Sequence, residues 1–214
     1  LTIENYGTIS LSGIGNEVIG SGGISAAGQG DVSILNEGLI DVDGQGISFG
    51  LSQRPTGGII LPPNEAVGSV TIRNGEEGQI FTDRISGTAI LAATSSNGSI
   101  FDISNAGDIS TEGIRSDGIL VDASRGFLGA FGGELERTTF SVINEETGNI
   151  RTSAEAGSGI QVLRGTDVSI NNLGFIETVG IQNSIADETG IILPGFVEDH
   201  TVSAAGVENL EIMN

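Results

Sequence analysis

The chain has 214 residues, enough for one sizeable core or a run of stacked repeats. Its 28 acidic residues against eight basic ones give a net charge of −20, which argues against nucleic acid and anionic lipid as partners. The lack of cysteine excludes disulfides, and no apolar run reaches the ~20 residues of a membrane span. With 35 glycines and 37% hydrophobic residues, we expect short β-strands joined by many turns.

The first predicted element is a strand with the pattern apolar-x-apolar-x-Asn, which occurs seven times. Alternation at period two places the apolar side chains and the asparagine on one face of each strand. We predict that the asparagines stack in a structural column and hydrogen-bond from one coil to the next. The strands start at Leu1, Val32, Val70, Phe101, Phe140, Val168 and Leu210, and end at Asn5, Asn36, Asn74, Asn105, Asn144, Asn172 and Asn214.

A glycine corner and a second strand follow each of the first six asparagines. The glycine comes two residues after the asparagine in four units, and after a two-residue insertion in the other two. An isoleucine two residues later starts the second strand. We expect glycine to supply unusual backbone angles at the corner. The glycines are Gly7, Gly38, Gly107 and Gly174, and, after insertions, Gly78 and Gly148.

A third strand is predicted later in each unit, usually after a glycine. These strands begin at Ile24, Ile47, Ile90, Ile119, Ile160 and Ile191. Three short strands per unit predict an all-β fold: a right-handed parallel β-helix, or β-solenoid, of about six coils. Residues 1–214 are expected to form a single solenoid segment.

The asparagine spacing suggests a larger repeat. Successive intervals are 31, 38, 31, 39, 28 and 42 residues, so paired coils form three repeats of about 70 residues. The extra length predicts protruding loops near 50–69, 122–139 and 194–209, in a row on one side. Loops on a repetitive scaffold usually carry function. Phe127, Phe131 and Phe196 in these loops are candidates for partner contact, or for covering the flank of their own coil.

Candidate chemical groups are few. A glycosidase needs two carboxylates across a cleft, and Asp41 with Asp43 lie on one strand face, but with 28 acids such pairs are easily found. No lysine is available as the base of a lyase. His200 is the only histidine and is read as a solvated loop residue. No cofactor is expected beyond Ca²⁺ on the acidic surface.

The first and last strands are in the same phase of the repeat, with no polar or helical cap. An uncapped solenoid exposes unpaired strand edges. We therefore expect either further coils in a longer repetitive chain or self-association through lateral or axial contacts.

The segments Ile3-Glu4-Asn5-Tyr6-Gly7-Thr8-Ile9 and Ile103-Ser104-Asn105-Ala106-Gly107-Asp108-Ile109 resemble the passenger domains of bacterial autotransporters and related β-helical adhesins. The resemblance implies export to the bacterial cell surface and a non-catalytic role in adhesion, in a coat or in a stalk. Its partners would be copies of itself, or a cell-surface glycan or protein. The alternative is a polysaccharide-processing β-helix (lyase, glycosidase or tailspike-like) with an acidic cleft.

Overall fold

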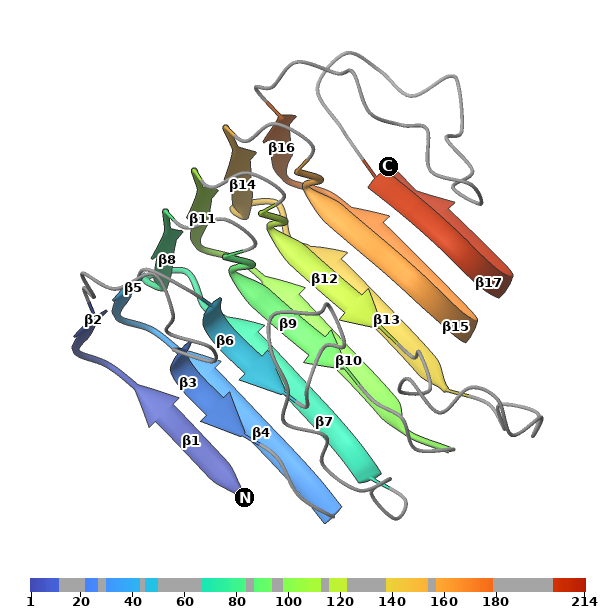
Figure 1. Ribbon diagram of the computed structural model, residues 1–214, viewed down its shortest axis with the longest axis horizontal. Helices are drawn as coiled ribbons and strands as arrows, with labels where there is room; N and C mark the ends of the chain where they lie inside the picture. The colour runs from blue at the N-terminus through green and yellow to red at the C-terminus, as the bar shows by residue number, and fades with distance from the viewer. Residues whose placement is uncertain are drawn as a thin grey trace, which may run out of the picture.

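The computed structural model describes residues 1–11, 22–26, 30–42, 45–49, 67–83, 87–93, 98–112, 116–122, 138–153, 157–178 and 202–214. Within these ranges every regular element is a β-strand, and the strands stack as successive coils along one axis (Figure 1). Neighbouring coils pair through parallel ladders. The predicted all-β solenoid with three strands per coil is confirmed.

The strands form three faces. Face 1 contains β1 (Thr2–Asn5), β4 (Gly30–Asn36), β7 (Val67–Asn74), β10 (Ile100–Asn105) and β13 (Thr139–Asn144). Face 2 contains β2 (Thr8–Leu11), β5 (Leu39–Val42), β8 (Gln79–Thr82), β11 (Asp108–Thr111), β14 (Asn149–Thr152) and β16 (Phe175–Thr178). Face 3 contains β3 (Gly22–Ala26), β6 (Gln45–Phe49), β9 (Ile90–Ala93) and β12 (Ile119–Asp122).

Two long strands join face 3 to face 1. β15 (Ile160–Asn172) pairs with β12 through its first residues and with β13 through its last, and β17 (Val202–Met213) pairs along both parts of β15. Faces 1 and 3 therefore merge into one 11-stranded sheet, while face 2 is a separate 6-stranded sheet. β15 and β17 each contribute a strand to both face 1 and face 3. Within the described residues, face 1 therefore holds seven strand positions, and faces 2 and 3 hold six each.

Columns of aliphatic side chains fill the interior, because the register repeats the same position in every coil. Ile34, for example, lies opposite Ile3 in the coil before and Ile72 in the coil after. Full burial of such a side chain contributes about 1.5–3 kcal/mol. The buried columns are Ile34, Ile72, Ile103, Val142 and Ile170 on face 1, Ile40, Ile80, Ile109, Ile150 and Ile176 on face 2, and Ile24, Ile47, Ile90, Ile119 and Ile160 on face 3.

The corners between faces 1 and 2 need glycine because successive coils approach closely there. The explanation from unusual backbone angles is wrong, since none of the six predicted corner glycines has a positive φ. A Cβ on Gly38 would lie 2.1 Å from the carbonyl oxygen of Gly7, and one on Gly107 would lie 2.1 Å from that of Gly78. These carbonyls are held in place by the ladder, as when Leu39 N–H donates to Gly7 O at 2.9 Å.

The two-residue insertions form turns that protrude at this corner. In the third coil residues 76–77 are exposed, and Gly78 N–H closes the turn by donating to Gly75 O at 2.9 Å. The equivalent bond in the fifth coil runs from Gly148 N–H to Glu145 O at 2.8 Å. The insertions are therefore absorbed locally, and the strands on either side keep their register.

The third strand of the sixth coil differs from the prediction. The favoured segment, 191–193, lies outside the described residues, and β17 supplies the strand instead. Val202 lies opposite Ile160, so residues 202–209, predicted as part of a loop, are strand. Leu210 follows Val202 by eight residues, as Val168 follows Ile160. This shared spacing allows one continuous strand to follow the other, although the local hydrophobic pattern is weaker.

The predicted row of three long loops changes as a result. Residues 50–66 and 123–138 each connect face 3 to face 1, whereas residues 179–201 connect face 2 to face 3. The third long segment therefore starts from a different corner than the first two.

We expect Gly107→Ala to destabilise the solenoid by at least about 3 kcal/mol, because the new Cβ meets a backbone carbonyl that no rotamer change can move away. Gly7→Ala is the matched control, since a Cβ at Gly7 meets nothing within 4 Å. Urea unfolding monitored by circular dichroism measures both changes. Equal destabilisation by the two variants would contradict the close-approach explanation.

Candidate functional site

The seven predicted asparagines form one continuous hydrogen-bonded ladder, which we call the asparagine ladder. Each Nδ2 donates to the Oδ1 of the asparagine in the next coil toward the C-terminus. The six bonds, starting from Asn5, measure 2.7, 2.8, 2.8, 2.9, 2.9 and 2.8 Å. Asn36, Asn74, Asn105 and Asn144 have no exposed surface. All the amides therefore point the same way along the axis.

Several ladder amides also donate a hydrogen bond to the carbonyl oxygen of the glycine at the following corner. Asn74 Nδ2 donates to Gly78 O at 3.2 Å, and Asn144 Nδ2 donates to Gly148 O at 3.3 Å. Asn36 makes the same contact to Gly38 O at 3.0 Å. Asn36, Asn74 and Asn144 thus have partners for both donors and for the oxygen, which offsets the cost of burying them. Amides used in this way are not free to bind a ligand.

A second buried polar column lies where face 2 ends, and the sequence analysis missed it. The Thr111 hydroxyl donates to Ser116 O at 3.2 Å, and the Thr82 hydroxyl donates to Gly87 O. These bonds hold the chain as it turns toward face 3. The signal that would have found the column is a repeated Ile-x-Thr, in Ile80-x-Thr82, Ile109-x-Thr111 and Ile150-x-Thr152.

Acidic side chains on the strands do not lie opposite one another in the described ranges. Asp41, one member of the candidate catalytic pair, is exposed and lies opposite Ser10 and Phe81. Asp108 accepts a hydrogen bond from Asn149 Nδ2 at 3.1 Å. In the strand pairs of the described ranges, no acid lies opposite another acid.

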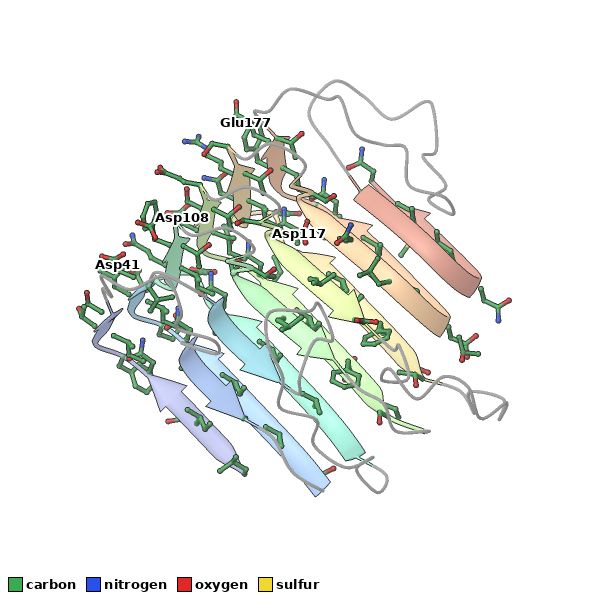
Figure 2. The ribbon with its side chains drawn as sticks, viewed as in Figure 1. Asp41, Asp108, Asp117 and Glu177 are labelled. Carbon is green, nitrogen blue, oxygen red and sulfur yellow. The ribbon has the colours of Figure 1, made fainter. Side chains whose placement is uncertain are left out.

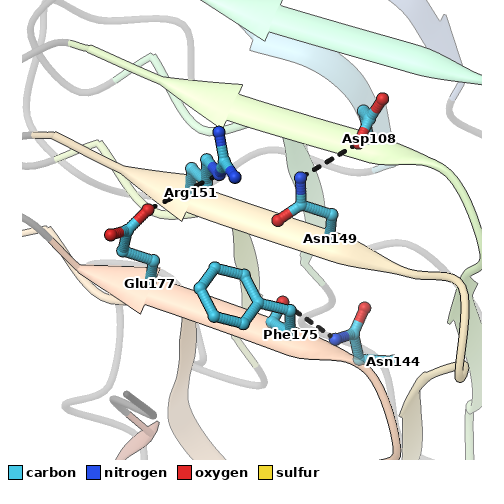
Figure 3. A network of polar contacts seen from close by, with 6 residues as sticks. All are labelled: Asp108, Asn144, Asn149, Arg151, Phe175 and Glu177. Atoms are coloured by element: carbon cyan, nitrogen blue, oxygen red, sulfur yellow. Dashed lines mark hydrogen bonds and ion pairs between the residues drawn. The ribbon is translucent and has the colours of Figure 1, made fainter. Parts of the chain in front are cut away.

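The outer surface of face 2 carries an ion pair at its C-terminal end (Figure 3). Arg151 Nε lies 3.5 Å from Glu177 Oε2, and the Arg151 guanidinium lies 5.9 Å from the centre of the Phe175 ring. The two charged side chains are 59% and 42% exposed, so solvent screening leaves the pair worth less than about 1 kcal/mol. This group fixes side chains on the surface but forms no enclosed site.

Asp117 differs from the other labelled acids in Figure 2. Asp41, Asp108 and Glu177 follow face 2 along the stack, whereas Asp117 lies apart from them, just before β12. Asp117 is 1% exposed, and its Oδ1 accepts Ser158 N–H at 2.9 Å, which links two successive coils. Among the described residues, no three His, Cys, Asp or Glu side chains gather closely enough to hold a metal ion.

The corner between faces 1 and 2 forms an acidic edge, which we define by the glutamates of its turns: Glu37, Glu76, Glu77, Glu145 and Glu146. At the first coil the same edge carries Tyr6, whose hydroxyl donates to Glu4 Oε2 at 3.4 Å. The negative charge of Glu4 raises the pKa of the Tyr6 hydroxyl. Negative charge is therefore concentrated along this edge, parallel to the solenoid axis.

The remaining predicted site residues lie outside the described part of the chain. These are the aromatic candidates Phe127, Phe131 and Phe196, together with Asp43 and His200. Of the predicted residues, the structure therefore brings together the ladder asparagines alone.

No family model, curated protein or solved structure matches the chain. The described residues include no helix that is long and apolar enough to cross a membrane. Function is therefore inferred from the geometry above.

We expect Asn105→Asp to destabilise the protein by about 3–5 kcal/mol at neutral pH, because a buried carboxylate cannot donate to Asn144 Oδ1. Burial raises the pKa of the new carboxyl above its unfolded value. The folded state then binds the proton more tightly, so the lost stability returns as the pH falls and the neutral acid donates again.

Asn5→Asp is the control, because Asn5 is only half-buried at the end of the ladder. Urea unfolding of both variants between pH 7 and pH 4, each compared with the parent chain, separates the two effects. A cost at Asn105 that matches the cost at Asn5, with no recovery in acid, would show that the ladder amides are not needed as donors.

Proposed function

We propose that this chain is a non-catalytic structural solenoid displayed outside a bacterial cell, where it forms part of a stalk, coat or filament and presents the segments between its strands to partners. The observation that carries the proposal is the unbroken asparagine ladder. It uses a chemically versatile side chain in every coil to hold one coil on the next. A protein built in this way is an extended, stiff support.

The outer surfaces favour this role over the polysaccharide-processing alternative. A glycosidase needs two carboxylates about 5–10 Å apart, a spacing that acids in adjacent coils of one column would provide at ~4.8 Å per coil. In the strand pairs of the described ranges, acids lie opposite neutral or basic residues instead. The net charge of −20 further disfavours an acidic polysaccharide as a ligand.

The connections from face 3 to face 1 are where partner contacts are best accommodated. Between β9 and β10 this connection takes residues 94–99, but between β12 and β13 it takes 123–138, and between β6 and β7 it takes 50–66. The register of β10 with β7 and with β13 is regular around the connections 94–99 and 123–138, whereas after the connection 50–66 the β4–β7 pairing shifts once, between Gly30 and Val32. The connection from face 3 to face 1 can therefore differ in length from coil to coil, as expected for a surface that contacts a binding partner.

We expect replacement of residues 123–138 by residues 94–99 to leave the unfolding midpoint nearly unchanged, because the preceding coil already uses this short connection. Binding of the labelled chain to bacterial cells and to a glycan array should fall at least severalfold. The same replacement of residues 50–66 is the matched variant. Binding that is unaffected by either replacement, or a parent chain that binds nothing, would count against display.

Incubation with neutral and acidic polysaccharides, with and without Ca²⁺, tests the alternative directly. We expect no new reducing ends or unsaturated products above those given by the Gly107→Ala variant. Turnover that survives repurification of the parent chain would rule out the non-catalytic role.

A further inference from the structure

One member of the asparagine ladder, Asn74, is followed directly by a glycine, Gly75. An Asn-Gly pair is the least hindered case for deamidation, because glycine has no Cβ to shield its amide nitrogen from the asparagine side chain. After five other ladder asparagines the next residue carries a side chain: Tyr6, Glu37, Ala106, Glu145 and Leu173. Among these six ladder positions, Asn74 is therefore the one whose neighbour allows the reaction most readily.

Deamidation at this pair needs water as its only co-reactant. The Gly75 nitrogen gives up its proton and bonds to Cγ of Asn74, and the Cγ–Nδ2 bond breaks to release ammonia. The product of this step is a five-membered succinimide. Water then opens the ring: aspartate forms when the new bond to nitrogen breaks, and isoaspartate forms when the original peptide bond breaks, so that the main chain runs through Cγ.

The folded structure holds each reacting group of this pair away from the reaction. Gly75 N–H donates to Asn36 O at 2.8 Å, and the Asn74 side-chain oxygen accepts from Asn36 Nδ2 at 2.8 Å. The leaving nitrogen, Asn74 Nδ2, donates to Asn105 Oδ1 at 2.8 Å and to Gly78 O at 3.2 Å. Asn74 has no exposed surface, so water does not reach its amide. Attack requires these bonds to break together, as they do when the coil opens.

Packing against the preceding coil explains why a glycine stands at this reactive position. A Cβ on Gly75 would lie 2.1 Å from Glu37 Oε1 and 2.3 Å from Glu37 Cδ. The other oxygen of this carboxylate accepts Glu77 N–H at 3.4 Å, so the Glu37 side chain lies over the turn. The contact involves the end of a flexible side chain, which can move aside. Gly75→Ala is therefore expected to fold, unlike a corner glycine that faces a backbone carbonyl.

From these observations we propose that Asn74–Gly75 is a covalent modification site that the asparagine ladder keeps inactive and that unfolding activates. In the unfolded chain the pair deamidates, and the reaction permanently removes one ladder donor from the third coil. The site lies in the middle of the stack, between β7 and β8 (Figure 1). The proposal adds a chemical property to the chain and does not depend on the proposed structural role.

Either product of the reaction prevents the third coil from forming again. At neutral pH a carboxylate at position 74 cannot donate to Asn105 Oδ1 or to Gly78 O, and a charge in the dry interior is costly. Isoaspartate adds a CH₂ group to the main chain between two strands that must both stay in register with the fourth coil. Unfolding that lasts long enough for the reaction is therefore irreversible.

Peptide mapping by mass spectrometry tests the site on the parent chain, incubated in mildly alkaline buffer with and without urea. Asn97, which precedes Gly98 and lies outside the described residues, is the internal standard, since both Asn-Gly pairs should deamidate at similar rates in urea. Without urea, Asn74 should react at least about 100-fold more slowly, because a stable domain is unfolded in fewer than about one molecule in 1,000. A smaller difference would overturn the claim that the ladder keeps the site inactive.

Refolding after increasing times in urea, measured by circular dichroism, tests the consequence. The parent and the matched Asn97→Gln variant should lose refolding in step with deamidation at Asn74, whereas Gly75→Ala should retain it. In the parent, molecules that refold should carry intact Asn74, a readout that does not require Gly75→Ala to fold. Modified Asn74 in the refolded fraction, or equal loss of refolding by Gly75→Ala, would show that the reaction does not block refolding.

Discussion

The hydrogen bond that each ladder asparagine donates to the next sets the condition that the rest of the structure meets. It requires the same side chain at the same height in every coil, and the parallel ladders of all three faces provide this at ~4.8 Å per coil. Chains of such bonds also polarise one another, which strengthens each bond in a dry interior. Columns of isoleucine follow from the same repeat, since a position that packs in one coil packs in all of them.

The corner glycines follow from the same constraint. Once the coils are held at the spacing of the ladder, the carbonyl of one corner lies where the Cβ of the next corner would be. The chain therefore varies in length only where it leaves the ladders. Six residues or 16 can join face 3 to face 1 with no change of register on either side. The interior must keep a fixed register from coil to coil, whereas the connections between faces can differ in length.

Much of this was readable from the sequence because a repeat offers several chances to detect one pattern. Seven asparagines at equivalent positions fixed the first strand, and Ile9 or Ile109 after a glycine fixed the second. The third strand of the last coil was not predicted at its observed position. It occurs once, and its pattern, Val202-x-Ala204, is less hydrophobic than Ile191-x-Leu193. There the register of the neighbouring coil outweighs hydrophobicity. The threonine column was not predicted, because threonine is equally common on exposed strands. Its role becomes evident only from the burial of Thr82 and Thr111 and from the hydrogen bonds that their hydroxyls donate.

The acidic edge adds a constraint of a different kind. Its insertions recur in the third and fifth coils, two coils or roughly 10 Å apart, which is close to the Debye length at physiological ionic strength. At that spacing the separate carboxylates act on an approaching body as a nearly continuous line of negative charge. Two solenoids lying side by side along this edge would repel each other over their whole length, whereas contact along the axis avoids it. These turns, which recur in alternate coils, thus bias any association of these molecules toward thin, single files and away from bundles.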